Sequence, residues 1–311
     1  MNTKCLEPST KNIKLCANAL ASGKVVAFPT ETVYGLGASL FQPDAIRQIF
    51  FLKNRPADNP LIVHISNLDE VSKIAKKIPD DFYILAKKFF PGPLTIVLKV
   101  QDIVPKIATA NKDTIAIRMP SNEYALKLIE YAKVPLVAPS ANLSGKPSAT
   151  TALHVVEDFN NKIPYILDGG NCEIGIESTV VLLSDDYPYL LRPGAVSAKD
   201  IELCLNKEVK INQKKHKGLS PGMKYRHYAP DAVVYLKKES ELESCQFLNP
   251  LFLSKDPLKE RKAIPLTRQN LYEVFRFADR NKFQEVVIID SDSLREDNAL
   301  FNRIEKAIKR T

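Results

Sequence analysis

Short apolar runs alternate with amphipathic stretches along the first two thirds of this chain. The run at 25–28 is continuously apolar, as expected of a strand that is covered on both faces. The stretch at 43–53 instead repeats its apolar side chains Ile46, Ile49 and Phe50 at helical spacing. The two patterns follow one another repeatedly, which predicts an α/β fold.

The same patterns can be followed from residue 11 to residue 206. Helices are predicted at 11–22, 43–53, 68–78, 80–90, 121–133, 150–159 and 197–205. Strands are predicted at 25–28, 61–65, 94–100, 114–119, 136–138, 163–167, 178–184 and 189–192. Short links join some neighbouring strands, so we expect a twisted mixed sheet in a three-layer α/β domain over residues 1–206.

A change of pattern follows this domain. Residues 207–230 show no sustained periodicity, which is typical of a linker. Residues 231–311 again alternate, with strands predicted at 232–236, 248–253 and 285–290 and helices at 270–280 and 297–310. We expect a second, small Rossmann-like α/β domain, near the lower end of independent domain size.

The composition fits a soluble globular protein. The chain has 311 residues, of which 45% are hydrophobic and 26% charged. No window approaches a membrane-spanning stretch and the start of the chain has no signal-peptide core, so a cytoplasmic location is expected. The five cysteines are scattered without C-x-x-C spacing, and the four histidines show no ligand spacing, which argues against disulfides and zinc.

The net charge of +8 is concentrated in one segment. Residues 206–230 hold seven Lys or Arg against one Glu, whereas the segments on either side are almost neutral. Such a segment can attract phosphates, or it can be a solvated connector. Both interpretations stay open on the charge alone.

Polar side chains follow the first strand, where open α/β sheets bind ligands. They are Thr30, Glu31, Thr32 and Tyr34. Pro29 ends the strand because it has no N–H to donate. Gly35 and Gly37 then allow unusual dihedrals or a close approach to a ligand. An ordinary turn would have the same composition.

Cations and hydroxyls stand beside several other turns. Lys53 and Arg55 end a helix, where they could clamp a phosphate or simply complement the helix dipole. Arg118 and Arg192 each end a strand, so the four cations together suggest a cationic cavity for an anionic ligand.

A second turn is rich in hydroxyls. Ser140, Asn142 and Ser148 follow a buried strand and could cradle a nucleotide phosphate, or cap a helix. The chain has neither a Walker loop nor a G-x-G-x-x-G fingerprint. No catalytic triad, catalytic cysteine or carboxylate pair stands out, which favours positioning and charge neutralisation, as in phosphoryl or nucleotidyl transfer.

These motifs together resemble one family. The runs at 28–37, 53–56, 59–64, 91–95, 116–120, 139–142, 177–180 and 191–194 are similar to those of YrdC-type threonylcarbamoyl-AMP synthases. The run at 220–230 resembles the linker of the long form, and Asn302 and Arg303 resemble the end of its extra C-terminal domain. That domain is shorter here than the long form leads us to expect, and the glycine-rich approach to Asn302 is absent.

The resemblance implies a reaction. L-Threonine, bicarbonate and ATP would give threonylcarbamoyl-adenylate and pyrophosphate, and a separate transferase would then modify tRNA. The threonine amine captures carbon dioxide or bicarbonate, and the carbamate oxygen attacks the α-phosphorus of ATP. Mg²⁺ would be carried mainly by the ATP, with no protein metal site.

The resemblance also implies the residues that do this. Threonine would be bound by Thr32, His64, Arg118, Ala138 and Ser178. ATP would be bound by Lys53, Arg55, Asn59, Thr114, Ser140, Asn142, Ser148, Arg192 and Tyr228, with Lys53 and Arg55 catalytic and the linker closing over the nucleotide. Taken without the resemblance, His64 could equally be a core histidine. The competing hypothesis is a double-stranded RNA-binding module without catalysis, suggested by the basic segment.

Overall fold

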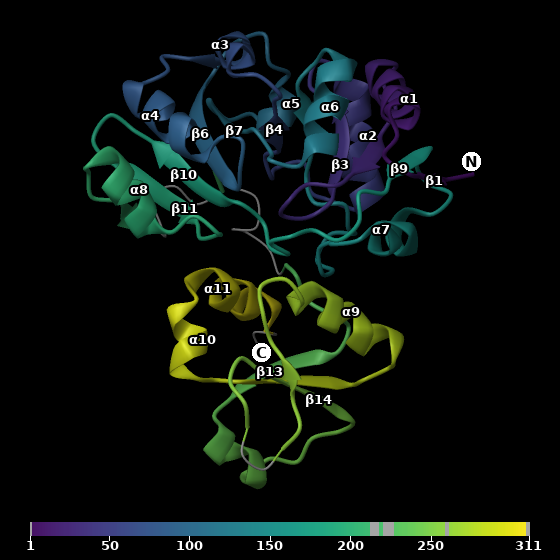
Figure 1. Ribbon diagram of the computed structural model, residues 1–311, viewed down its shortest axis with the longest axis vertical. Helices are drawn as coiled ribbons and strands as arrows, with labels where there is room; N and C mark the ends of the chain where they lie inside the picture. The colour runs from purple at the N-terminus through teal and green to yellow at the C-terminus, as the bar shows by residue number, and fades with distance from the viewer. Residues whose placement is uncertain (1, 212–217, 220–226, 259–260, 309–311) are drawn as a thin grey trace. The chain divides into compact units, whose positions relative to one another are not determined.

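The computed structural model describes residues 2–211, 218–219, 227–258 and 261–308 (Figure 1). It forms two compact units. The first comprises Met1–Ser144 and Ala149–Lys224, and the second comprises Gly145–Ser148 and Tyr225–Thr311. The sequence placed the boundary at 206, with 207–230 as a linker that covers the active site; most of that linker lies outside the described residues.

Twelve strands of the described residues form the sheet of the first unit. They are β1 Lys4–Leu6, β2 Val26–Phe28, β3 Gly35–Ser39, β4 Ile62–His64, β5 Ala75–Lys76, β6 Leu94–Val100, β7 Thr114–Arg118, β8 Leu136–Val137, β9 Tyr165–Leu167, β10 Thr179–Leu183, β11 Pro188–Arg192 and β12 Lys210–Ile211. Their order is β1-β9-β2-β3-β8-β4-β7-β6-β10-β11-β12, and β5 pairs with β6. Neighbours such as β4 and β7 are parallel, whereas β6 and β7 are antiparallel, so the prediction of a mixed sheet is confirmed.

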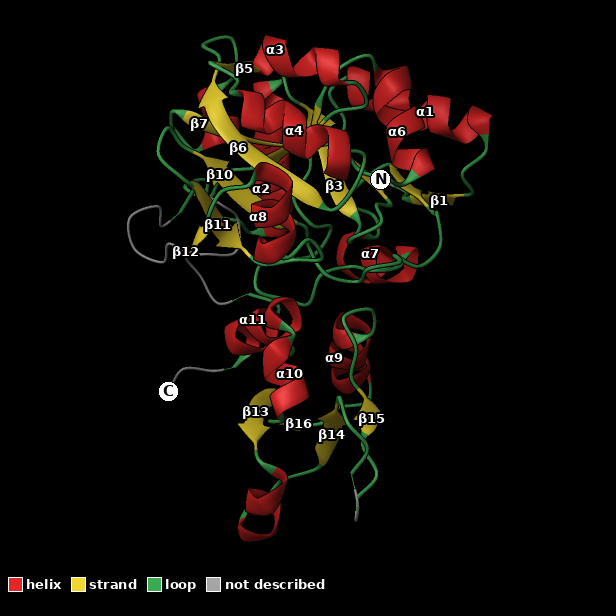
Figure 2. Cartoon of the chain, turned by 60° about the vertical axis from the view of Figure 1, so that its left-hand side comes forward, coloured by secondary structure: helices red, strands yellow, loops and turns green. Residues whose placement is uncertain are grey.

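Helices cover this sheet (Figure 2). They are α1 Thr10–Ala21, α2 Pro43–Lys53, α3 Val71–Ile74, α4 Asp80–Phe89, α5 Lys106–Thr109, α6 Glu123–Ala132, α7 Ala152–Phe159 and α8 Ala198–Leu205, together with a 3₁₀ turn, η1, at Leu68–Glu70. Helix α2 begins and ends where the sequence predicts. Its end is set by Asn54, which adopts the left-handed conformation that closes many helices.

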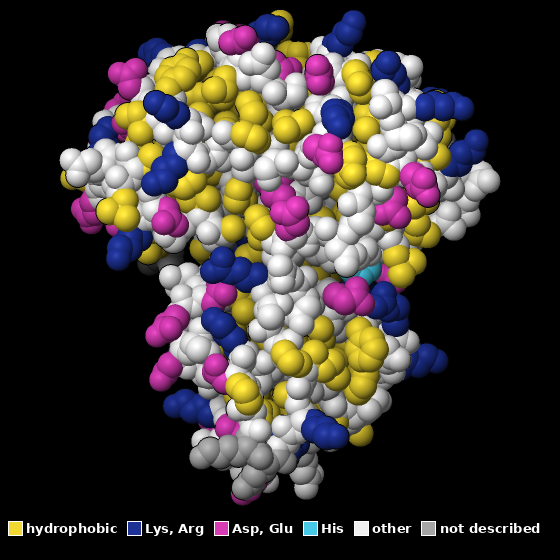
Figure 3. Space-filling view, viewed as in Figure 1, with side chains coloured by type: hydrophobic (Ala, Val, Ile, Leu, Met, Phe, Trp, Pro, Cys, Tyr) yellow, Lys and Arg dark blue, Asp and Glu magenta, His cyan; other side chains and the backbone are white. Residues whose placement is uncertain are grey.

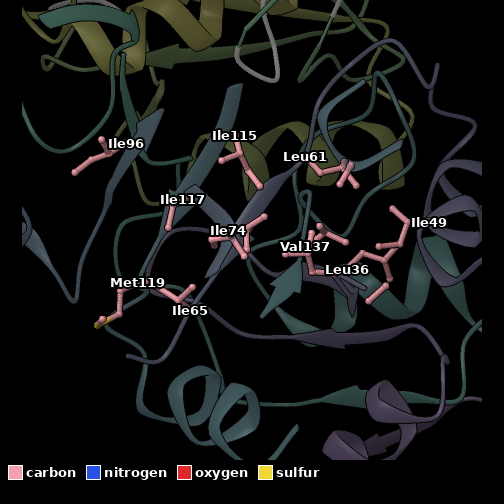
Figure 4. Close-up of a cluster of buried hydrophobic side chains, with 14 of the residues drawn as sticks. Leu36, Ile49, Leu61, Ile65, Ile74, Ile96, Ile115, Ile117, Met119 and Val137 are labelled. Carbon is pink, nitrogen blue, oxygen red and sulfur yellow. The ribbon is translucent and has the colours of Figure 1, made fainter. Parts of the chain in front are cut away.

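Side-chain alternation along the central strands divides the core into layers. In β2, Ala27 belongs to the large cluster with helices α2, α4, α7 and α8, whereas Val26 and Phe28 pack with α1 and α6 on the other face. Figure 4 shows part of the large cluster, where Ile49 of α2 and Val137 of β8 lie among the strand residues. A strand covered on both faces explains why the run at 25–28 is continuously apolar.

The residues at 35–39 correct one prediction. They form strand β3, which pairs with β2, and not the end of a turn. A Cβ on Gly37 would lie 2.7 Å from Cε1 of Phe28, so this glycine makes room for the ring across the strand pair. The turn itself is confined to residues 29–34. Packing against Phe28, and not unusual dihedrals, accounts for the glycine.

The helix predicted at 68–78 is also wrong in its second half. After η1 and the short helix α3, Ala75 and Lys76 form β5 and pair with β6. Tertiary pairing overrides the local helical pattern there. The short elements β1, α5 and β12 were not predicted, because two to four residues carry no clear period.

The second unit is a small α/β structure. Its strands are β13 Val233–Lys237, β14 Pro250–Ser254, β15 Ile264–Pro265 and β16 Glu285–Ile289. Its helices are α9 Leu271–Arg280, α10 Asp292–Glu296 and α11 Asn298–Ala307, with a 3₁₀ helix, η2, at Glu239–Ser244. The strands are parallel in the order β13-β16-β14-β15. The three longer strands and helix α9 follow the prediction, while the helix predicted at 297–310 ends at Ala307.

Candidate active site

Several predicted site residues project from one face of the sheet. On β4, β7, β6 and β10, the residues Ile62, Ala116, Val97 and Val180 form a cluster opposite the large core. Side chains two positions along a strand share a face. The polar side chains that follow this rule include His64, Arg118, Thr95 and Ser178 at one end of the strands, and Thr114 at the start of β7. The pairing of His64 with Arg118 across β4 and β7 places these two side by side.

The turn after β2 is organised by Thr30. Its hydroxyl donates to the carbonyl of Val33 (2.6 Å) and accepts from the backbone N–H groups of Thr32 and Val33. The Thr30 and Thr32 hydroxyls are 2.9 Å apart, and Thr30 has already used its proton, so Thr32 is the donor. Thr32 can therefore accept from other donors, one of which is Nη1 of Arg118 (2.8 Å), while Thr30 is structural.

Tyr34 is likewise bound within the protein. Its hydroxyl donates to the carbonyl of Gly170 (2.8 Å) and accepts from the N–H of Gly169 (3.2 Å). These bonds tie the first turn to the turn after β9. The ambiguity that the sequence left at Thr30 and Tyr34 is thereby resolved in favour of turn structure.

Arg118 is held by two segments of the chain, at Gly92 and in the turn that contains Glu31 and Thr32. Its Nε donates to the carbonyl of Gly92 (3.2 Å) and its Nη1 to Oγ1 of Thr32 (2.8 Å). Its Nη2 lies 2.7 Å from Oε1 of Glu31, with angles unsuited to a hydrogen bond, so the contact is an ion pair only. Arg118 and Glu31 are each about 4% exposed. The structure thus brings Thr32 and Arg118, two residues predicted to bind threonine, into direct contact and adds Glu31.

His64 is neutral beside this arginine. Burial, then the charge of Arg118, lowers its pKa to about 3, although the nearby carbonyl of Ile62 opposes this shift. Its Nδ1 lies 3.3 Å from that carbonyl, and its ring meets Phe28 edge to face. A neutral imidazole can accept or donate a hydrogen bond without adding charge to the site.

Ser178 joins the end of β10 to two neighbours. Its hydroxyl lies 2.7 Å from that of Thr95 and accepts from Nη2 of Arg192 (3.2 Å). Nε of Arg192 also donates to the carbonyl of Ser178 (3.1 Å). A predicted threonine-binding residue and a predicted ATP-binding residue are therefore in direct contact. All three side chains are buried.

Lys53 meets the second predicted turn. It is 1% exposed, and its Nζ donates to the carbonyls of Ser140 (2.6 Å) and Asn142. The hydroxyl of Ser140 donates to Oδ1 of Asn142, at 2.5 Å. This burial shows that Lys53 is not a solvated side chain at the helix end. Lys53, Ser140 and Asn142 form one group.

The remaining predicted residues of the first unit are Arg55, Asn59, Ala138 and Thr114. Arg55 is half-buried, and its Nη2 donates to the carbonyls of Asn59 (3.3 Å) and Pro60 (3.2 Å). The backbone N–H of Ala138 donates to the carbonyl of Ile62, the first residue of β4. Thr114 begins β7, so it lies about 13 Å along the strand from Arg118. That distance separates it from the Arg118 group.

Ser148 and Tyr228 belong to the second unit. Ser148 is fully buried there. The ring of Tyr228 lies 5.6 Å from that of Tyr272, with the guanidinium of Arg303 over it at 5.5 Å. These two predicted ATP-binding residues therefore belong to a different compact unit from the other seven.

Two further observations concern metal ligands and membrane-spanning helices. Within the described ranges, no three His, Cys, Asp or Glu side chains come together as a metal site. No helix in the described part of the chain is long and apolar enough to cross a membrane. The buried cations Lys53, Arg118 and Arg192 are each held by carbonyl, hydroxyl or carboxylate groups, an arrangement suited to fixing anionic groups by position and charge.

Sequence reasoning missed two buried side chains of this region, Glu31 and Thr95. Glu31 was noted as a polar residue after a strand, without a role. The feature that could have pointed to Glu31 is that it is an acidic residue among buried positions, because a buried carboxylate needs a partner. Thr95 lies in the run at 91–95 and had no chemical signal apart from its alternation with Val97.

The fold and these groups define a class of protein: a mixed α/β domain that presents buried cations and hydroxyls at the ends of its strands. The comparisons give the family. A family model described as "Telomere recombination" (Sua5, YciO and YrdC) matches residues 18–194. A second, described as "Threonylcarbamoyl-AMP synthase, C-terminal domain", matches residues 196–308. The chain belongs to the Sua5/YciO/YrdC family, in its form with this C-terminal domain.

Individual relatives support the same family assignment. The threonylcarbamoyl-AMP synthase of Bacillus subtilis is 38% identical over 328 residues, covering 97% of this chain and 94% of the relative. That of Pyrococcus abyssi is 51% identical over 227 residues, covering 71% of this chain and 66% of the relative. The crystal structure of P. abyssi Sua5 complexed with L-threonine has a TM-score of 0.89 and 37% identity, and the similarity covers both chains completely.

Proposed function

We propose that this chain is an L-threonylcarbamoyladenylate synthase, a nucleotidyltransferase that makes threonylcarbamoyl-AMP and pyrophosphate from L-threonine, bicarbonate and ATP. The observation that carries the proposal is the Thr32–Arg118 contact in a family that includes named threonylcarbamoyl-AMP synthases. Arginine offers a carboxylate a planar fork of donors. Thr32, His64 and Ser178 lie around it and contribute neutral polar groups.

The threonine site consists of the predicted set. Arg118 binds the substrate carboxylate through the N–H groups that Gly92 and Thr32 do not use. Thr32, whose proton goes to Thr30, accepts a hydrogen bond from the substrate. Ser178 and the backbone at Ala138 complete the site.

The ATP site is built on the other group. Lys53 and Arg55 stabilise charge as the carbamate oxygen attacks the α-phosphorus and pyrophosphate leaves. The bonds from Lys53 to the carbonyls of Ser140 and Asn142 hold its charge in place. Asn59, Thr114 and Arg192 bind the rest of the nucleotide. Mg²⁺ enters on the triphosphate and neutralises part of its charge.

The proposal also covers the step that follows synthesis, the cellular location and the second unit. A separate transferase passes the threonylcarbamoyl group to tRNA, in the cytoplasm. The second unit, with its parallel sheet, is Rossmann-like in this proposal. Direct RNA binding through the basic segment at 206–230 is the alternative function, and nothing in the family comparison favours it over synthesis.

The proposal is tested by pyrophosphate release from purified protein, ATP, bicarbonate and threonine. We expect release to require threonine. Release that continues at the same rate without threonine contradicts the proposal, as does RNA binding that persists without ATP while no pyrophosphate forms.

A further inference from the structure

Glu31 is a buried acid that the proposed mechanism leaves without a role. It lies in the turn between β2 and β3, where its backbone carbonyl accepts from the N–H of Ile174 (2.8 Å). Neither carboxylate oxygen has a hydrogen-bond donor among the described residues. Burying a carboxylate without hydrogen bonds costs free energy, so the presence of Glu31 at this position needs an explanation.

The partner of Glu31 is also incompletely bonded. Nη2 of Arg118 lies 2.7 Å from Oε1 of Glu31, but it makes no hydrogen bond to any described group. Arg118 is oriented instead by Gly92 and Thr32, through Nε and Nη1. Glu31 therefore adds charge to the arrangement, and the other two residues supply its geometry.

The two charges of this pair offset each other. Arg118 is positive and Glu31 negative, while His64 stays uncharged because its pKa is lowered to about 3. In a buried region, where charges are weakly screened, a ligand with net charge disturbs this balance strongly. A ligand that carries one positive and one negative group leaves it intact.

We propose that Glu31 makes the Arg118 site selective for a zwitterionic amino acid over a plain carboxylate anion. This inference rests on the threonine site proposed above and names the residue that selects the charge type. The ammonium of the amino acid compensates the negative field of Glu31, so the ligand carboxylate can reach Arg118. An anion without an ammonium meets an arginine that is already neutralised.

The test compares two ligands in matched variants. The probes are L-threonine and 3-hydroxybutyrate, in which hydrogen replaces the α-amino group. In Glu31→Gln, which keeps the shape and removes the charge, we expect weaker threonine binding and tighter anion binding, so that their affinity ratio falls at least tenfold. Glu31→Asp keeps the charge and should keep the ratio within about threefold. Glu130→Gln, on the exposed side of α6, is the control and should behave as wild type.

The outcomes are separable. If Glu31→Gln weakens both ligands by one factor, or changes neither, Glu31 is structural and the inference is overturned. If Glu31→Gln does not fold, the wild type still decides: the inference requires it to bind 3-hydroxybutyrate at least 100-fold more weakly than threonine, and comparable affinities overturn it. If the wild type does not bind threonine, the proposed function fails first.

Discussion

Replacing Thr95 by valine removes one hydroxyl and almost no volume. Thr95 is fully buried on β6, and its Oγ1 lies 2.7 Å from the hydroxyl of Ser178. The variant leaves Ser178 with one neighbour fewer, a loss of about 1–2 kcal/mol for one buried hydrogen bond. For a unit of this size, each 1 kcal/mol lowers Tm by about 2–4 °C.

The same change should act on one substrate. Without Thr95, the Ser178 hydroxyl loses one of the two groups that orient it, the other being Nη2 of Arg192. We therefore expect KM for threonine to rise about tenfold, which corresponds to about 1.4 kcal/mol. Nε of Arg192 still binds the carbonyl of Ser178, so KM for ATP should change little.

Steady-state pyrophosphate release, with threonine and ATP varied separately, measures this effect. Thr95→Ser keeps the hydroxyl and loses a methyl group, so it should lose stability but keep the wild-type KM for threonine. An unchanged KM for threonine in Thr95→Val, or an equal rise in Thr95→Ser, refutes the reasoning.

Three other predictions concern different parts of the first unit. Arg55→Ala should lower kcat about 10²-fold or more with little loss of stability, because Arg55 is half-buried and its bonds to the carbonyls of Asn59 (3.3 Å) and Pro60 (3.2 Å) are long. Arg47→Ala, on the exposed face of α2, is the control. Gly37→Ala should destabilise by about 1–3 kcal/mol in urea unfolding, more than Gly35→Ala, because its Cβ would meet the Phe28 ring at 2.7 Å and not 3.2 Å. The pKa of His64 is lower in the folded state than in the unfolded state, so the free energy of unfolding decreases as pH falls below about 6.5. Between pH 7 and pH 5, the free energy of unfolding of His64→Gln should decrease by roughly 2 kcal/mol less than that of the wild type. Equal losses in both would show that His64 is not buried and neutral.

Periodic stretches of the sequence were enough to predict most of the sheet. Helix α2 and strand β6 have the predicted bounds, because eleven and seven residues of regular pattern outweigh local exceptions. Strand β3 was missed because glycines normally weaken strands, and their reason, the Phe28 ring on the neighbouring strand, is visible only in three dimensions. Strand β5 exists through its pairing with β6, which no local pattern records.

The residues of the candidate site were likewise only partly predictable from the sequence. Cations at the ends of elements, such as Lys53 and Arg118, could be singled out from sequence because they follow apolar runs. Their partners could not, since Lys53 binds backbone carbonyls at Ser140 and Asn142, which carry no side-chain signal. Glu31 lay in view but lacked a role until its ion pair with Arg118 was known.

The distribution of charged side chains on the surface is relevant to the alternative hypothesis of RNA binding. On the face shown in Figure 3, Lys and Arg side chains are interspersed with Asp and Glu on each unit, without one continuous basic field. Binding to a phosphate backbone relies on clustered positive charge and is strongly salt-dependent. The buried Arg118 and Arg192 are better suited to small anionic groups than to a duplex.

The most direct measurement is mass spectrometry of a reaction that contains purified protein, L-threonine, bicarbonate and ATP. The account predicts threonylcarbamoyl-adenylate, formed in equal amount with pyrophosphate and absent when threonine or ATP is omitted. ATP cleavage without this adduct, or an adduct that forms equally well in Arg118→Gln, contradicts it.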